Sequence, residues 1–345
     1  MLAPDSELWL LEHTVEILYG EMPLFDPKTI VERVNMPPPA FPTEEDRQWE
    51  VCLNAIRASA IPVRTINSAM HEVAVLAWAF FKNAHSILPE VILHGDSLIA
   101  VQVLLAMAMY MRCSTDARTM SRLLSLAVPM AHSIGLHSAE SNKGIEPAEA
   151  AMRNRVFWIA YILDAETSLL HGVPTCIRCE DIDTELPGAD ASDVDGLRVF
   201  RLRADLATIQ SVIRRRLYAA RALQQTDGDL IDTVQELNRL LEAWRAKVPA
   251  DLAPVAERGP DDEPRELPIL LLHLSYYSTV SMVSWASRRL CGWGNPARNW
   301  LAGSTRQILS TCPLYSNVLR CKGAAESTVR LFIENAGSWQ FMEFW

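Results

Sequence analysis

The segment from Leu98 to Met111 constrains the fold most, because only Gln102 within it is strongly polar. A helix that is apolar on nearly every side is buried in a core and does not lie on a surface. A chain of 345 residues with 49% hydrophobic and 21% charged residues has the composition of a globular protein that can bury such a helix. We therefore expect this segment at the centre of the core, with Asp96 as its N-cap.

Apolar residues recur at helical spacing along most of the remaining chain. Pro147 is placed to open one helix, and Gly135 and Gly172 are each placed to end one. The spacing predicts helices over 8–18, 46–94 with interruptions at Pro62 and Pro89, 118–134 with a kink at Pro129, 147–170, 199–217, 230–248, 267–290, 298–312 and 316–335. Strand alternation never extends beyond four residues, and 14 glycines are few for repeated tight hairpins. The sequence therefore predicts an all-α fold, a multi-helix array with no substantial sheet.

The charge of the chain argues against a broad interface with duplex DNA, since the formal net charge is −10. The densest basic run is Arg214 to Arg216, and the same predicted helix carries Arg198, Arg201, Arg203 and Arg221. Consecutive helical residues point about 100° apart, so the run does not form one flat patch. We interpret these arginines as the solvated side of a helix that flanks an apolar seam. A contact with phosphate or with an acidic partner is the alternative.

The cysteines and the N-terminus indicate the compartment. The seven cysteines are scattered and odd in number, and the N-terminus carries acidic residues where a signal peptide needs basic ones. Both features favour a reducing compartment with free thiols. The longest unbroken apolar run, Val103–Met111, is shorter than the roughly 20 residues that span a bilayer. We therefore expect a soluble, intracellular protein without a membrane partner.

Motifs that carry chemistry are missing from the sequence, which has no Walker A loop, no G-x-S-x-G and no G-x-G-x-x-G. Cys176 and Cys179 form a lone C-x-x-C, and without a second pair we expect loop cysteines and no metal site. The acidic run Asp261-Asp262-Glu263 is similar to the magnesium-binding runs of all-α terpene cyclases, but prolines bracket it, so we expect a solvated loop. We predict that the chain is not an enzyme, with an all-α enzyme as the remote alternative.

Two stretches are more specific than these motifs. The first is the expected helix end Ala131-His132-Ser133-Ile134-Gly135-Leu136-His137, where a last-turn histidine can interact with free carbonyls. The second stretch contains, in order, Arg153-Asn154-Arg155-Val156-Phe157-Trp158, Asp164, Gly172-Val173-Pro174, Asp181-Ile182-Asp183 and Leu186-Pro187.

The residue types in the second stretch favour structural roles. We expect Arg155 to reach a carboxylate or a helix-end carbonyl, because its guanidinium is a planar fork of donors. Phe157 and Trp158 supply large buried area. Asp181 and Asp183 are expected to cap the next turn or to pair with arginines. For Asp164, the sequence suggests no partner.

In this order and spacing, the motifs resemble the middle homology (regulatory) domain of fungal binuclear zinc-cluster transcription factors. In that family a helix ends in G-L-H, a second helix carries R-x-F-W and a later aspartate, and a G-x-P loop leads to D-x-D and L-P. The resemblance covers most of residues 8–335. It implies a helical and proline-rich lead-in at 1–45 and a core at 46–190 that carries the motifs. A helical part at 191–345 would pack on the core and end early for this domain.

The resemblance implies a transcription regulator in the nucleus that controls transcription by RNA polymerase II in response to a small molecule or a partner. Its partners would be the transcription machinery or a related regulator. The family's six-cysteine zinc cluster, which reads DNA, has no counterpart in this sequence. We therefore expect no zinc or other cofactor in this chain and no direct contact with DNA. The alternative is an interaction protein, deficient in DNA binding, that forms homodimers or heterodimers through helices at 197–221 or 229–248.

Overall fold

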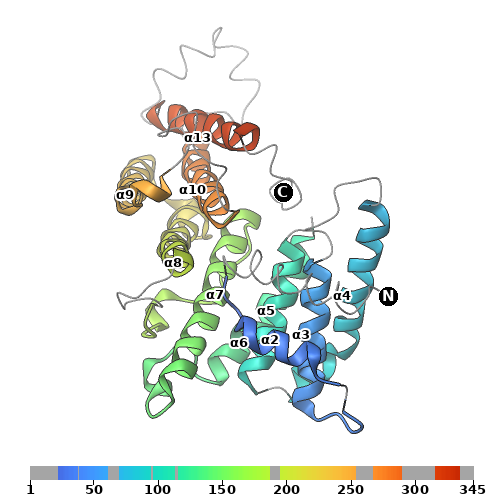
Figure 1. Cartoon of the computed structure of the whole chain (residues 1–345). Helices are drawn as coiled ribbons and strands as arrows, with labels where there is room; N and C mark the ends of the chain where they lie inside the picture. Colours follow the sequence, from blue (N-terminus) through green and yellow to red (C-terminus); the bar gives the residue numbers. More distant parts are fainter. Residues whose placement is uncertain are drawn as a thin grey trace. The chain divides into compact units, whose positions relative to one another are not determined.

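The computed structural model describes residues 22–37, 39–60, 70–94, 96–112, 116–186, 195–253, 267–289 and 315–334. Within these ranges the chain forms α-helices, short 3-10 helices and a π-helical turn, and no strand (Figure 1). The all-α prediction is confirmed. The chain divides into two compact units: unit 1 contains the described residues up to Thr167 and from Thr175 to Ala204, and unit 2 contains Ser168–Pro174 and the described residues from Asp205 on.

Unit 1 is built around one central helix, α5 (Leu98–Arg112), which contacts three other helices of the unit. Ten of its 15 residues are buried, and Gln102 donates a hydrogen bond to the carbonyl oxygen of Leu24 at 2.6 Å. The expectation that this segment lies at the centre of a core is confirmed. The other elements of unit 1 are α2 (Pro27–Asn35), α3 (Glu44–Ala60), α4 (Met70–His94), α6 (Ala117–Ser133), η2 (Ala139–Asn142), α7 (Pro147–His171) as far as Thr167, η3 (Cys179–Asp181) and α8 (Asp195–Ile213) as far as Ala204.

Two expectations about helix ends in unit 1 are wrong. Helix α4 continues through Pro89, which lies on its exposed side, so water can bind the carbonyl that loses its N–H partner. Asp96 is not the N-cap of α5, because the helix begins at Leu98 and the preceding residue, Ser97, takes that position. The Oγ of Ser97 accepts the N–H of Ala100 at 3.2 Å. Helix α6 also continues through Pro129, and the kink there stays a prediction.

Unit 2 has α10 (Leu267–Ala286) as its central helix, with contacts to α9 (Asp227–Lys247) and α13 (Tyr315–Glu334). The expected helices at 230–248, 267–290 and 316–335 are confirmed. The expected helix at 199–217 instead passes from α8 into a π-helical turn, η4 (Arg214–Tyr218). The remaining elements are η5 (Ala222–Gln224), η6 (Ala250–Leu252) and η8 (Ser287–Arg289). The helices expected at 8–18 and 298–312, the break at Pro62 and the acidic run at 261–263 lie outside the described residues.

Among the described residues, α10 is the one helix that is long and apolar enough to cross a membrane. The share of its apolar window that is buried inside the protein is 61%. The central helix of a folded domain has the same length and composition, and burial against α9 and α13 explains its apolar residues. The division into segments 1–45, 46–190 and 191–345 stays a prediction.

Candidate regulatory site

The first motif forms a complete helix C-cap at the end of α6. Gly135 has a φ of 75°, in the left-handed region that favours glycine. The N–H of Leu136 binds the carbonyl oxygen of Ala131 at 2.9 Å, and the N–H of Gly135 binds that of His132 at 3.0 Å. This is the paired bonding of a Schellman motif, and the side chain of Leu136 is fully buried behind it. The G-L-H sequence therefore fixes the direction in which the chain leaves α6.

The side chain of Arg153, on α7, forms hydrogen bonds that stabilise this cap. Its Nη2 donates to the carbonyl oxygen of Ile134 at 2.8 Å, and its Nε donates to the Oδ1 of Asn142 at 2.9 Å. This is the helix-end contact that the sequence suggested for Arg155. Arg155 lies two residues further along α7, and its Nε has no hydrogen-bond partner. Burial lowers the pKa of Arg155, and the negative charge of Asp26 partly offsets this.

The segment after η3 returns to the same cap. The backbone N–H groups of Asp183 and Thr184 both bind the carbonyl oxygen of His137 at 3.2 Å. The Oδ1 of Asp183 accepts the N–H of Ala139 at 2.8 Å, so this carboxylate caps η2, which precedes it in the chain, rather than the turn that follows. Trp158, also on α7, donates its indole N–H to the carbonyl oxygen of Glu185 at 3.0 Å. Residues 183–185 are thus held between the end of α6 and the side of α7.

His132 and His137 meet across the cap as an edge-to-face ring pair, with centroids 4.9 Å apart. Burial lowers the pKa of His132, and the neighbouring His137 lowers it further, while Asp181 acts in the opposite direction. The Nε2 of His132 and the Nδ1 of His137 are buried without hydrogen-bond partners. These surroundings therefore favour the neutral imidazole of His132.

Asp164 has the partner that the sequence could not supply. Its two carboxylate oxygens accept the N–H of Cys176 at 2.9 and 3.1 Å, and Oδ2 also accepts the N–H of Ile177 at 3.1 Å. Burial raises the pKa of Asp164, and these N–H groups partly offset the rise. The carboxylate of Asp164 thus accepts the backbone N–H groups of Cys176 and Ile177, in the loop that follows α7.

Cys176 and Cys179 are free thiols at this loop. Desolvation raises the pKa of Cys176, and the negative charge of Asp164 raises it further. A protonated thiol is a weak nucleophile and a weak metal ligand. Among the residues described here, no three His, Cys, Asp or Glu side chains come together in a way that could hold a metal ion.

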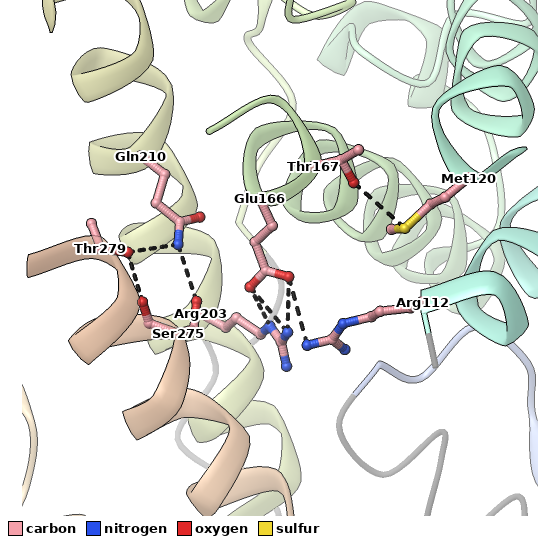
Figure 2. Close-up of polar contacts among 8 residues, drawn as sticks. All are labelled: Arg112, Met120, Glu166, Thr167, Arg203, Gln210, Ser275 and Thr279. Carbon is pink, nitrogen blue, oxygen red and sulfur yellow. Dashed lines mark hydrogen bonds and ion pairs between the residues drawn. The ribbon is translucent and has the colours of Figure 1, made fainter. Parts of the chain in front are cut away.

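A buried ionic cluster forms around Glu166, two residues after Asp164 on α7. Glu166 accepts two hydrogen bonds from Nη2 of Arg203, at 3.0 and 3.1 Å, and one from its Nε at 3.2 Å. The Nη2 of Arg112, in the last turn of α5, lies 3.7 Å from the Oε2 of the same carboxylate (Figure 2). Arg203 is 1% exposed, and burial lowers its pKa to about 9, so it is still charged at neutral pH.

The prediction that Arg203 lies on the solvated side of its helix is therefore wrong. The apolar residues around it define a helical face but do not tell which neighbouring position is covered by another helix. Sequence reasoning also missed Glu166. A glutamate that follows the apolar run 156–163 of α7 was the signal that could have found it, because an acidic side chain is rarely buried without a partner.

In unit 2, Arg214 caps the G-x-P motif. Its Nη2 donates to the carbonyl oxygen of Gly172 at 3.0 Å, and its Nε donates to that of Val173 at 3.1 Å. Gly172 has a φ of 72°, which lets the chain leave the end of α7. Pro174 follows, and its carbonyl oxygen accepts a weak bond from the hydroxyl of Ser168 at 3.4 Å. Pro187, the last residue of the second stretch, lies outside the described residues.

The π-helical turn that begins at Arg214 is held by partners from α10 and from η8, which follows it. Arg289 donates to the carbonyl oxygen of Leu217 at 3.1 Å, and the hydroxyl of Tyr218 donates to that of Met282 at 2.5 Å. Burial raises the pKa of Tyr218 to about 12, so the hydroxyl keeps its proton. Arg289 thus supplies a donor to a carbonyl of the turn, and Tyr218 ties the turn to α10.

A second polar contact inside unit 2 joins α8 to α10. The Nε2 of Gln210 donates to the hydroxyls of Ser275 at 3.0 Å and Thr279 at 2.9 Å, and Thr279 in turn donates to the carbonyl oxygen of Ser275 (Figure 2). Buried hydrogen bonds of this kind fix one rotational position of a helix more strictly than apolar contacts do. The hydrogen bonds of Gln210 therefore fix the position of this part of α8 against α10 within unit 2.

Comparison with known proteins places the chain in a family. Residues 49–246 match the fungal specific transcription factor domain. A protein named ABC-transporter-regulating transcription factor from Aspergillus oryzae is 32% identical over 343 residues, which cover 96% of this chain and 38% of that protein. The protein of the same name from Aspergillus fumigatus is 32% identical over 83% of this chain and 33% of its own length. The fusaridione A cluster transcription factor of Fusarium heterosporum is 32% identical over 80% of this chain and 53% of its own length.

The chain therefore belongs to the fungal specific transcription factor domain family, and the part that it carries is the middle homology domain of zinc-cluster transcription regulators. It spans between a third and just over half of the length of these curated relatives. No solved structure matches the chain.

Proposed function

We propose that this chain is the regulatory region of a fungal zinc-cluster type transcription factor that acts in the nucleus. It would control transcription by RNA polymerase II in response to a small molecule or a partner protein. The observation that carries the proposal is the family match over residues 49–246, which includes the buried cluster of Glu166, Arg203 and Arg112. Such fixed positions suit a regulatory helix array, because a packed element with discrete arrangements can pass a binding event to a distant segment.

The proposal assigns no reaction to the chain. Two acidic side chains of α7, Asp164 and Glu166, are engaged by backbone N–H groups and by arginine. The names of the relatives point to regulators of transcription rather than to enzymes. Two relatives are named for the regulation of ABC transporters, so a transporter promoter is the first promoter to test.

A reporter assay tests the proposal. The chain is fused to a heterologous DNA-binding domain and an activation segment, and reporter output is measured with and without a panel of candidate metabolites. We expect output to depend on the chain and to change with at least one metabolite. The matched controls are fusions that carry Glu166→Ala, which disturbs the buried cluster, and Glu140→Gln, which changes an exposed side chain. Output that is the same with and without the chain under every condition contradicts the proposal.

A partner protein is the second candidate for the signal. The helices at 197–221 and 229–248 were the two surfaces expected from the sequence. In the second, the apolar residues are buried within the chain: Leu230, Val234, Leu237, Leu241 and Trp244. A partner would therefore have to use the helix at 197–221 or another surface. Co-purification of the tagged chain with a full-length related regulator tests this, and a chain that always elutes alone argues for a small molecule as the signal.

A further inference from the structure

Helix α13 has two faces of opposite character. One face carries Asn317, Ala324 and Leu331, which are spaced seven residues apart and are all buried. This face packs within unit 2, where α13 contacts α10. Asn317 also accepts a hydrogen bond from Asn238 of α9 at 2.7 Å. The buried face of α13 is therefore accounted for by its own unit.

The opposite face is exposed and carries a regular pattern, with successive spacings of three, four, three and four. Its members are Leu319, Lys322, Glu326, Val329 and Ile333. The three apolar members are 52%, 57% and 70% exposed, in chain order. Lys322 and Glu326 form an ion pair at 3.4 Å between side chains that are 70% and 61% exposed. We call these five residues the outer face of α13. The spacing is that of a seam between two helices.

Gly323 lies beside the centre of the outer face. A glycine inside a helix weakens it relative to alanine. A Cβ added at Gly323 would meet nothing within 4 Å, so the packing of this chain does not require a glycine there. A missing side chain at that position lets a second helix approach closely.

We propose that the outer face of α13 pairs with the same face of a second copy of this chain, in an antiparallel arrangement about a two-fold axis that passes between Lys322 and Glu326. In this arrangement Lys322 lies opposite the partner's Glu326, and Leu319 lies opposite the partner's Val329. By symmetry each of these contacts is made twice, as an isologous interface requires.

The order of charges along the outer face favours a second copy of this chain as the partner and an antiparallel direction of pairing. The face reads apolar, basic, acidic, apolar from Leu319 to Val329. Antiparallel pairing with itself matches these four positions, with opposite charges at the centre and apolar residues on both sides. Parallel pairing would place Lys322 on the partner's Lys322 and Glu326 on the partner's Glu326, which is repulsive. The face of one helix is smaller than the roughly 800 Å² per partner of a standard interface, so we expect a weak dimer that depends on concentration.

Sedimentation equilibrium on the 345-residue chain tests the pairing. We expect the average mass to rise from 38.6 kDa toward twice that value as concentration increases. Lys322→Glu and Glu326→Lys should each weaken association about tenfold or more, because each places like charges opposite one another. An equimolar mixture of the two variants should associate again, since the carboxylates at positions 322 and 326 of one chain then face the ammonium groups at positions 326 and 322 of the other. The double variant with both changes should also associate.

The matched control is Lys143→Glu, which reverses an equally exposed charge in unit 1 and should leave the mass unchanged. Circular dichroism checks that each variant keeps its helix content. A wild-type chain that stays monomeric at all accessible concentrations overturns the proposal. So does a dimer that survives both single variants, which would place the interface elsewhere. Single variants that fail to associate even when mixed would overturn the antiparallel pairing.

Discussion

Arg203 and Glu166 are joined inside unit 1 by three hydrogen bonds of 3.0 to 3.2 Å, although 37 residues separate them in the chain. Burying two charges costs free energy, and a well-packed apolar pair in their place is often as stable. The pair contributes to the specificity of the fold, because arrangements that bury either charge in unit 1 without the other are unfavourable. It thereby ties the position of α8 within unit 1 to that of α7.

Glu166→Ala should lower the free energy of unfolding by about 3–5 kcal/mol, because it leaves the charge of Arg203 buried without its carboxylate. The measurement is the urea transition of the chain. The control is the double variant Glu166→Leu with Arg203→Met, which removes both charges and should cost much less. If Glu166→Ala unfolds at the wild-type urea concentration, the cluster does not hold α8 in place.

Asp164→Ala should cost about 1–3 kcal/mol, since the buried N–H groups of Cys176 and Ile177 lose their acceptor. Hydrogen exchange at these two amides gives a direct reading, and both should exchange faster in the variant. Glu140→Gln serves as the control, because that side chain is 73% exposed and a surface change of this kind has little effect. Unchanged protection at Cys176 and Ile177 would show that another group holds the loop.

Gly135→Ala should destabilise the protein more than Gly172→Ala does. Both glycines have a positive φ, so both alanines carry the cost of the left-handed conformation, about 1–2 kcal/mol. At Gly135 the new Cβ would also lie 2.8 Å from the Cβ of Ser141, whereas at Gly172 it meets nothing within 4 Å. Thermal unfolding of the two variants measures the difference, and equal losses would mean that the contact with Ser141 relaxes without cost.

The stability of unit 1 should fall as the pH is lowered through the ordinary pKa of histidine, 6.5. The pKa of His132 in the folded protein is lower than this value, so the unfolded chain takes up the proton first and acid favours unfolding. The groups that face His132 are His137, which enhances the effect, and Asp181, which opposes it. In His132→Gln, the change in unfolding midpoint between about pH 7.5 and about pH 5.5 should be smaller than in the wild type. An identical change in both proteins would assign the pH dependence to other groups.

Much of the framework could be read from residue patterns. The burial of α5, the helix ends at Gly135 and Gly172 and the burial of Phe157 and Trp158 follow from local properties that a sequence shows directly. Apolar periodicity and the conformational freedom of glycine do not depend on what lies nearby. These features were therefore predicted at the correct positions.

The polar contacts could not be predicted, because they depend on which segments meet. Asp164 binds backbone N–H groups, and every residue except proline has one, so no side-chain type reveals the partner. Arg153 and Arg155 are two residues apart on α7 and point about 200° apart, so only the fold decides which one reaches the end of α6. An arginine is usually exposed, so its residue type predicted exposure for Arg203. In the fold it is buried because Glu166 provides a buried carboxylate as its partner.

The apolar character of α10 has a consequence for how the protein is made. Ribosomes add about 5–20 residues per second, and residues 287–314 are made after α10 is complete and before α13 begins. For a few seconds the nascent chain therefore contains a helix as apolar as a membrane-spanning helix but lacks α13, which later packs against it in unit 2. Chaperones should bind the nascent chain mainly while residues 287–314 are being translated. The yield of soluble protein should therefore be sensitive to the speed of translation over these codons.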